Sequence, residues 1–317
     1  MTSRAFAPAT VANVACGFDV LGLALTEPGD TVVAERVDEP GVALASIEGD
    51  GGRLARNPAS NTATVAAQHL IELMDVDPSV GVRIELHKGL PLESGMGSSA
   101  ASAVAAVVAV DHLLGLEATR LDLLVSALAG EQVAAGAGHA DNAAASLYGG
   151  FVLVRPAAEI DVVRLPVPNG LAVALVRPHR EVSTKDSRVL LGNVVKLQDA
   201  VAQWANLGAL VAGLYSEDWD LISRALEDHI AEPIRSQAVP GFHDVQRAAL
   251  DEGALGCSLS GSGPSMFALC RHLEIAERVS RRMVETFANA AGLESDRYVS
   301  PISERGARII EIEACAS

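Results

Sequence analysis

Hydrophobic and polar positions follow two periods in the first half of the chain. Residues 31–34 and 82–86 have the alternating pattern of short strands. Residues 62–74 instead repeat apolar side chains every three or four positions, which predicts a helix. The segment 100–114 has no polar stripe, so we expect a helix that is buried on most sides and ends at Gly115.

The second half of the chain mixes short apolar runs with long helical repeats. A helical pattern covers most of 193–229, and another covers 273–291. The predicted strands lie within 150–164, as a pair, and at 171–176, 254–258, 265–270 and 307–312. This order favours an α+β fold with helices on one face of an antiparallel sheet. Because 317 residues exceed one typical core, we predict two domains, 1–160 and 161–317.

Composition and charge narrow the classes of function. The chain is 49% hydrophobic, enough for a packed core, and its net charge of −16 argues against a general nucleic-acid binder. The uncharged apolar stretch 100–110 is too short to span a bilayer, and residues 1–14 lack the apolar region of a secretory signal. The four cysteines are scattered and show no metal-ligand spacing. We therefore expect a cytoplasmic protein with reduced thiols, and neither a nucleic acid nor a membrane as partner.

The strongest local motif is the sequence PLESGMGSSAA at 91–101. Gly95 and Gly97 permit tight backbone turns and the close approach of a ligand. Ser98 and Ser99 would begin the next helix, where free N–H groups and the helix dipole attract an anion such as a nucleotide phosphate. The motif is neither a Walker loop, since no Lys-Ser/Thr pair follows the glycines, nor GxGxxG after a strand. An ordinary serine-capped helix is the alternative explanation.

A single acidic residue stands out in a further predicted helix, 121–134. Leu124, Leu128 and Glu131 share one face of that helix by three- and four-residue spacing. A carboxylate on an apolar face needs a partner, which is either a cationic side chain or a bound metal ion.

Three motifs together resemble the GHMP kinase superfamily, named for galacto-, homoserine, mevalonate and phosphomevalonate kinases. They are APATVAN at 7–13 followed by Gly-Phe-Asp at 17–19, the loop at 91–101, and GCSLSGSGPS at 256–265. The resemblance implies two α+β domains, the second ferredoxin-like, with ATP held where they meet. The second motif would wrap the triphosphate, and the third would brace the second.

The same resemblance implies roles at the nucleotide. Mg²⁺ would be held by Glu131 and the Ser98 hydroxyl, and its remaining positions would be left for phosphates and water. Asn61 would lie against the adenine. The composition around it is that of an ordinary loop, and the nearby Asn57 is a second asparagine in the same region. The residues implied to contact ATP are Asn61, Pro91, Glu93, Ser94, Gly95, Met96, Gly97, Ser98, Ser99, Ala100 and Ala101.

For the reacting hydroxyl, the resemblance points to the segment 138–142. In members that phosphorylate homoserine, an asparagine matching Asn142 lies near the hydroxyl and the γ-phosphate, and no dedicated base is needed. Mevalonate-type members use an aspartate assisted by a first-motif lysine, and here that motif has Thr10 instead. Asp141 remains a candidate base. His139 is a weaker candidate that is explained more simply as a loop residue.

The substrate-selecting positions resemble the branch of the family that phosphorylates L-homoserine, which implies a place in threonine biosynthesis. In its ANxxxGFD pattern, Asp19 would accept hydrogen bonds from the substrate ammonium and Asn13 would orient the hydroxyl. Both residue types also form ordinary turns and caps. Arg188 and Arg235 would clamp the carboxylate, although a single arginine is more often a solvated surface charge. Thr184 belongs to the same segment as Arg188, STKDSR, in which Ser187 replaces the usual alanine.

Two other functions remain compatible with these motifs. One is a related kinase for mevalonate, an isoprenoid or a sugar, against which the missing lysine and the arginine pair both count. The other is a non-catalytic ATP-binding protein of the same fold, against which Glu131 and the intact 91–101 loop count. Apolar helical stretches such as 204–214 fit either a core or an interface, so the sequence allows a homodimer.

Overall fold

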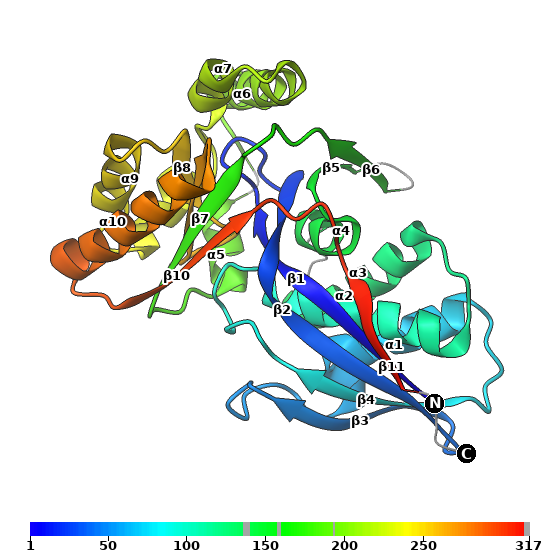
Figure 1. Ribbon diagram of the computed structural model, residues 1–317. Coiled ribbons are helices and arrows are strands. Elements are labelled where there is room, and N and C mark those ends of the chain that lie inside the picture. Colours follow the sequence, from blue (N-terminus) through cyan, green and yellow to red (C-terminus); the bar gives the residue numbers. More distant parts are fainter. Residues whose placement is uncertain (136–139, 157–159, 193, 314–317) are drawn as a thin grey trace.

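Two β-sheets organise the molecule, and the computed structural model describes them through residues 1–135, 140–156, 160–192 and 194–313 (Figure 1). The larger sheet has seven strands and the smaller has four. The central path of the larger sheet runs β11 (Arg308–Glu313), β1 (Thr2–Ala12), β2 (Leu21–Val37), β4 (Gly81–His87), β3 (Gly41–Glu48). Off this path, β5 (Phe151–Arg155) pairs with β2, and β6 (Asp161–Leu165) pairs with β5.

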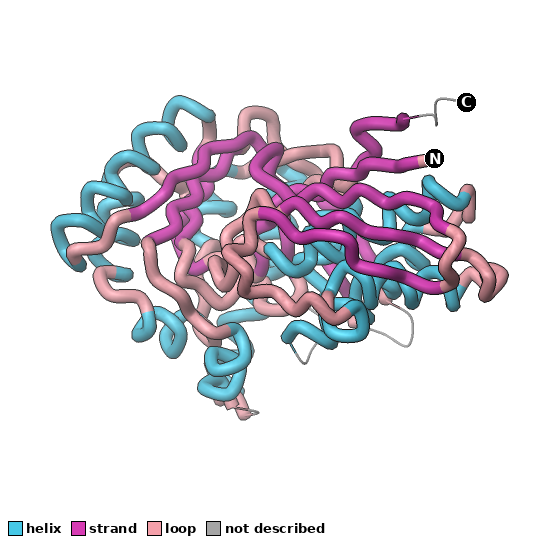
Figure 2. Tube along the Cα trace, turned by 90° about the horizontal axis from the view of Figure 1, so that it is seen from below, coloured by secondary structure: helices cyan, strands magenta, loops and turns pink. Residues whose placement is uncertain are grey.

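Helices cover one face of the larger sheet, and Figure 2 shows the helices in cyan beside the magenta strands. They are α1 (Thr62–Leu73), α2 (Ser98–Leu114), α3 (Arg120–Ala135) and α4 (Ala140–Tyr148), with the short 3-10 helix η1 (Pro58–Ser60) before α1. The helix α2 packs on β1 and β2, while α1, α3 and α4 pack around it. Most of its side chains are fully buried, and it ends at Gly115 in a left-handed conformation. The predicted buried helix is therefore confirmed.

The smaller sheet has the strand order β10 (Ser295–Pro301), β7 (Ala172–Pro178), β9 (Met266–Cys270), β8 (Gly256–Leu259), with every pair antiparallel. Both α9 (Phe242–Asp251) and α10 (Leu273–Ala291) pack against it. Between β7 and β9 lie α5 (Thr184–Leu191), α6 (Leu197–Ser216), α7 (Trp219–Ala225), α8 (Glu232–Arg235), η2 (Ser236–Ala238), α9 and β8. This β-α-β-β-α-β order is the predicted ferredoxin-like arrangement. The polar strand β10 was not predicted.

Strand β7 joins the two halves of the molecule. Its alternate residues Val173 and Leu175 belong to the hydrophobic core that also fills the larger sheet and its helices. Ala172, Ala174 and Val176 point instead into a second core beneath α9 and α10. One core therefore continues from one half into the other and fixes their relative orientation.

The chain passes between the sheets twice, after β6 and before β11. Because β6 pairs with β5 in the larger sheet, the predicted division between 160 and 161 falls inside a hairpin, and β11 returns to pair with β1. The exact domain limits stay a prediction. Among the described residues, no helix is both long and apolar enough to cross a membrane.

Candidate active site

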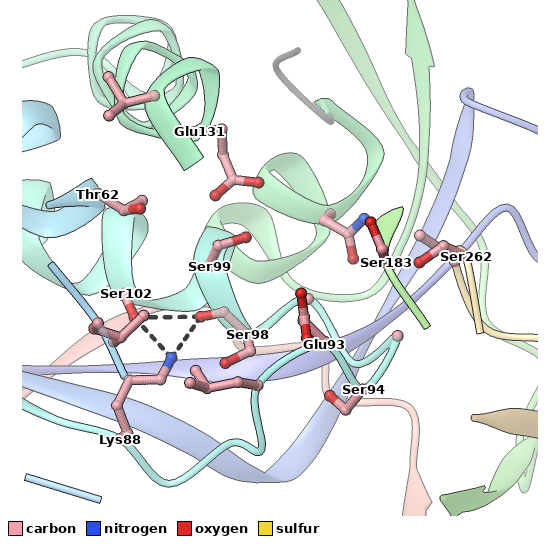
Figure 3. A pocket seen from close by; sticks show the side chains of 18 of the residues that line it. Thr62, Lys88, Glu93, Ser94, Ser98, Ser99, Ser102, Glu131, Ser183 and Ser262 are labelled. Atoms are coloured by element: carbon pink, nitrogen blue, oxygen red, sulfur yellow. Dashed lines mark hydrogen bonds between the residues drawn. The ribbon is translucent and has the colours of Figure 1, made fainter. Parts of the chain in front are cut away.

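The first and third motifs, the 91–101 loop, α3 and α4 surround a cavity of about 490 Å³ (Figure 3). The predicted site residues that line it are Asn13, Asp19, Asn61, Glu93, Ser94, Gly95, Gly97, Ser98, Ser99, Glu131, Asp141, Asn142 and Arg235. Met96, Ala100 and Ala101 instead point into the hydrophobic core, and Pro91 and Arg188 are not among the residues that line the cavity. His139 and the side chain of Thr184 lie outside the described part of the chain.

Direct hydrogen bonds hold the three motifs together. The N–H of Thr10, in the first motif, donates to the carbonyl of Met96 at 3.1 Å. From the third motif, the Ser260 hydroxyl donates to the carbonyl of Gly95 at 2.6 Å. The predicted bracing of the loop by the third motif is thus confirmed, and it passes through backbone groups that no side-chain pattern reveals.

Gly95 and Gly97 are both required for two reasons: each has a positive φ, and a side chain at either position would clash with neighbouring atoms. Gly95 has a φ of +78°, and a Cβ there would lie 2.4 Å from the Ser260 carbonyl oxygen. Gly97 has a φ of +69°, and its Cβ would lie 2.1 Å from the Thr10 hydroxyl and 2.7 Å from the Asn142 side-chain oxygen. The expected close approach is therefore to the protein's own chain at both positions.

Helix α2 begins at the cavity. Ser98 is its first residue, and the N-cap is Gly97, which is left-handed and has no side chain that could cap the helix. The alternative of a serine-capped helix is therefore wrong, because the serines lie inside the first turn. The first-turn N–H groups lack helical partners, and the helix dipole adds partial positive charge, so this end of the cavity favours an anion. We call it the α2 end, made by Ser98, Ser99, Lys88 and Glu131.

Glu131 projects from α3 toward the start of α2 (Figure 3). Its side chain is 2% exposed and receives a hydrogen bond from the Ser99 hydroxyl. Burial raises the pKa of its carboxyl to about 7, although the Ser99 hydrogen bond and the positive charge of Lys88 act in the opposite direction. The carboxyl predicted to lie on an apolar helix face therefore reaches the cavity at its anion-binding end.

Sequence reasoning missed the buried ion pair between Lys88 and Asp30, whose side chains are 1% and 0% exposed. The Lys88 ammonium also donates to the Ser98 carbonyl and to the Ser102 hydroxyl, each at 2.8 Å (Figure 3). The Ser102 hydroxyl in turn donates to Asp30 at 2.7 Å. A lysine just before the 91–101 motif was visible in the sequence, but its partner on β2, 58 residues earlier, was not. The network ties the first turn of α2 to the sheet.

Asp141 and Asn142 lie in the first turn of α4 and line the cavity. The Asp141 carboxyl is 3% exposed and accepts hydrogen bonds from the N–H groups of Asn142, at 2.9 Å, and Asn13. Burial raises the pKa of this carboxyl to about 7, and the charge of Asp19 adds to the effect. The Asn142 side-chain oxygen accepts from the Thr10 hydroxyl at 2.7 Å, so Thr10 of the first motif fixes the asparagine amide.

At another end of the cavity, which we call the Phe18 end, Asn13, Asp19 and Arg235 line the wall. Phe18 and Arg188 are not part of the lining but contact the residues that are. Asn13 has a φ of +69°, donates to the Gly261 carbonyl at 2.9 Å and accepts from the Asp19 N–H at 3.0 Å. Its amide therefore fixes the turn that carries Asp19. The Asp19 carboxylate forms an ion pair with Arg188 at 2.6 Å.

An aromatic ring joins the two arginines at this end. The guanidinium carbons of Arg188 and Arg235 lie 5.4 and 5.1 Å from the centroid of the Phe18 ring. Arg235 is 5% exposed and donates to the Gly261 carbonyl at 3.1 Å, and burial lowers the pKa of its guanidinium from the ordinary value. The two predicted arginines thus meet, although they are far apart in sequence. Phe18 belongs to the first motif, but no role was predicted for it from the sequence.

Asn61 has a structural task of its own. Its side-chain oxygen accepts the N–H of Ala63 and so caps α1, while its amide donates to the Ala55 carbonyl, both at 3.0 Å. Leu54, Leu86 and Val133 also line this part of the cavity, which gives it apolar walls.

Comparison with known proteins agrees with this geometry. The family model described as the GHMP kinases N terminal domain matches residues 61–150, and that for the GHMP kinases C terminal matches 210–289. The fold and the site are thus those of a GHMP-type small-molecule kinase.

Similar proteins narrow the family further. The chain is 48% identical to the homoserine kinase of Chlorobium phaeobacteroides, covering 98% of this chain and 99% of that protein. It is 48% identical to that of Chloroherpeton thalassium, with 96% and 98% covered. The crystal structure of homoserine kinase from Cytophaga hutchinsonii superposes with a TM-score of 0.93 at 50% identity, covering 98% of this chain and 97% of the other. The chain therefore belongs to the homoserine kinase family of the GHMP kinases.

Proposed function

We infer that the protein transfers the γ-phosphoryl group of ATP to the side-chain hydroxyl of L-homoserine, which gives O-phospho-L-homoserine for threonine biosynthesis. The observation that carries this conclusion is that one cavity joins an anion-binding helix start to Arg235 and Asp19, and that Asp19 is paired with a second arginine, Arg188. Membership of the homoserine kinase family supports it independently.

We assign the α2 end to the nucleotide. The N–H groups at Ser98 and Ser99 would receive the phosphates, and the apolar walls beyond Asn61 suit a flat base. Because Asn61 caps α1 through its oxygen and uses one N–H on the Ala55 carbonyl, its contribution to the adenine would come from the second N–H of its amide. The Lys88 network holds the first turn of α2 in place before ATP arrives.

The donor atoms at the α2 end fit Mg²⁺. Glu131 and Ser98 offer a carboxylate and a hydroxyl beside the predicted phosphate position, and Mg²⁺ prefers few protein oxygens plus phosphates and water. Among the described residues, no group of three His, Cys, Asp or Glu side chains forms a dedicated metal cage, which agrees with a metal that arrives with the nucleotide. When bound, Mg²⁺ would neutralise phosphate charge.

We assign the Phe18 end to the amino acid. A zwitterion presents a carboxylate and an ammonium, and the Asp19–Arg188 pair presents the two opposite charges side by side. The substrate would insert between Asp19 and Arg188. Its carboxylate would bind Arg188 and Arg235, and its ammonium would pair with Asp19 in place of Arg188. Thr184 stays a further predicted contact.

We assign Asn142 to orientation of the hydroxyl and Asp141 to positioning. The Asp141 carboxyl already accepts N–H groups from Asn13 and Asn142 and therefore holds both residues in place. A loose, metaphosphate-like transition state lets the alcohol keep its proton until late, so that no strong base is needed. If Asp141 acts by positioning, Asp141→Asn keeps measurable turnover and loses little of its pH dependence.

A cytoplasmic location is part of the proposal. It is supported by the buried free thiols Cys16, Cys257 and Cys270 and by the use of ATP.

The test of the proposed function is ADP release from Mg-ATP with L-homoserine, set beside R-mevalonate, D-galactose and shikimate. We expect turnover with L-homoserine at least about 100-fold above the other alcohols, because they lack the paired carboxylate and ammonium. Equal turnover with a sugar or with mevalonate would overturn the substrate assignment and leave the kinase.

A further inference from the structure

Gln203 is a polar side chain on the buried face of helix α6. It is 7% exposed, and its spacing places it on the same side of the helix as Leu210 and Leu214, which are fully buried. A buried amide is stable only when its polar atoms have hydrogen-bond partners. The partners of Gln203 therefore indicate what the residue holds together.

The Gln203 amide joins two segments that lie far apart in the sequence. Its nitrogen donates to the Cys16 carbonyl at 2.9 Å and to the Asp228 carboxylate at 3.0 Å. Its oxygen accepts the N–H of His229 at 2.8 Å. Two acceptors and one donor thus face the side chain, and a carboxamide matches all three, whereas a carboxylate lacks both donors and an aliphatic chain makes none of these bonds.

Both segments lead into the acceptor end of the cavity. Cys16 comes three residues before Asp19 in the first motif. Asp228 accepts the N–H groups of residues 230–232 at distances between 2.8 and 3.0 Å, and it thereby orders the turn that enters α8. That helix ends at Arg235. The Gln203 amide therefore connects the turn that carries Asp19 to the helix that carries Arg235.

The position of Arg235 depends on groups from both segments. Its guanidinium carbon lies 5.1 Å from the centroid of the Phe18 ring, which belongs to the first motif. Burial lowers the pKa of the Arg235 guanidinium, and the negative charges of Asp19 and Asp228 act in the opposite direction. A shift of α8 relative to the first motif would therefore move the guanidinium away from the ring and out of line with the acceptor.

We propose that Gln203 is a positioning residue of the acceptor site: its amide fixes the first motif and the start of α8 relative to each other, and so places Arg235 for the carboxylate of the acceptor. The inference rests on the proposed function, since it takes the amino acid to bind at the Phe18 end. Gln203 is not part of the cavity lining, so its effect falls on the affinity for the acceptor and not on the transfer of the phosphoryl group.

The first test is Gln203→Met, which keeps the length of the side chain and removes its three hydrogen bonds. We expect the KM for L-homoserine to rise at least about 10-fold, because a small displacement of a clamping group weakens binding, while kcat and the Kd for ATP stay within about threefold. The matched control is Asn206→Leu, since Asn206 lies on the same helix and its amide contacts the same loop, at the Glu227 carbonyl. A KM in Gln203→Met no higher than in the control overturns the proposal.

A second measurement separates positioning from a general loosening of the site. The compound 3-amino-1-propanol has the amino and hydroxyl groups of homoserine and lacks its carboxylate. We expect its Ki as a competitor of L-homoserine to change less than about threefold in Gln203→Met, because Arg235 has no carboxylate to bind in this compound. A rise in this Ki as large as the rise in KM overturns the positioning role.

Asp228→Asn tests the same path from its other end and does not depend on the folding of Gln203→Met. It removes the charge beside Arg235 and one acceptor for the turn into α8, so we expect the KM for L-homoserine to rise about 3- to 10-fold with kcat unchanged. An unchanged KM in Asp228→Asn also overturns the proposal. Absence of any turnover of L-homoserine by the wild type would instead count against the proposed function itself.

Discussion

At the α2 end of the cavity, the groups that face the ligand space are backbone N–H groups of one helix and a carboxylate from its neighbour. At the Phe18 end they are side chains from separate segments: Asp19 follows β1 and Arg235 ends α8, and Arg188 of α5 is paired with Asp19. The α2 end is held from behind by the fully buried pair of Lys88 and Asp30, whereas the Asp19–Arg188 pair is 35% and 45% exposed.

This difference indicates a division of labour. A triphosphate is common to many kinases, and its site is built from local backbone geometry that is fixed before binding. An acceptor differs from one kinase to the next, and its site is built from charged side chains that can exchange partners when the acceptor enters. Substitutions at the α2 end should therefore change stability and turnover, and substitutions at the Phe18 end should change the KM for the acceptor.

The largest effect should follow from breaking the support of the α2 end. Lys88→Met leaves Asp30 charged and buried, so we expect a loss of about 3–5 kcal/mol in the free energy of unfolding, measured by urea titration. The matched control is Arg83→Met, which breaks an exposed ion pair with Glu35 and should cost less than about 1 kcal/mol. Equal losses in the two variants would contradict the account.

Loss of the Glu131 carboxylate should lower turnover more than it lowers folding stability. We expect Glu131→Gln to lower kcat by about 10²–10³-fold, because phosphate charge is no longer offset through this carboxylate. Glu93→Gln is the comparison, since Glu93 also lines the cavity but forms a half-exposed ion pair with Arg53, and it should change kcat by only a few fold. Steady-state kinetics at saturating ATP would decide, and near-normal kcat in Glu131→Gln would refute the assignment.

A smaller effect concerns pH. The pKa values of Glu131 and Asp141 are raised by burial to about 7, above their ordinary 4.5 and 3.8. Between those values the folded protein holds protons that the unfolded chain releases, so the contribution of both groups to stability falls as pH rises and is fully lost above about pH 7. In ligand-free protein, the melting temperature of Glu131→Gln should therefore fall less between pH 5 and pH 8 than that of the wild type. An identical fall in both proteins would contradict the raised pKa of Glu131.

The α2 end was largely predictable from sequence because its signals are local. Two glycines, two serines and the helical face of Glu131 each lie within one short segment. The Lys88–Asp30 pair was not predictable, because it depends on strand pairing across 58 positions. The strand β1 was also not predicted, although its motif was, since Pro8 interrupts the strand pattern and the pairing with β2 shifts register there.

At the Phe18 end, the resemblance to the family supplied the residues but not their arrangement. Nothing in the sequence showed that Arg188 already pairs with Asp19, or that both arginines share the Phe18 ring. These contacts depend on the placement of α5 and α8 beside the first motif, and α8 is held by its packing on α5 and β8.

The division between the two ends is tested most directly by measuring the KM for L-homoserine and the Kd for ATP side by side in Arg235→Leu. The account predicts a KM raised on the order of 100-fold, from the loss of a buried guanidinium for the substrate carboxylate, with the Kd for ATP within about twofold of the wild type. An unchanged KM, or a comparable loss of ATP affinity, would contradict it.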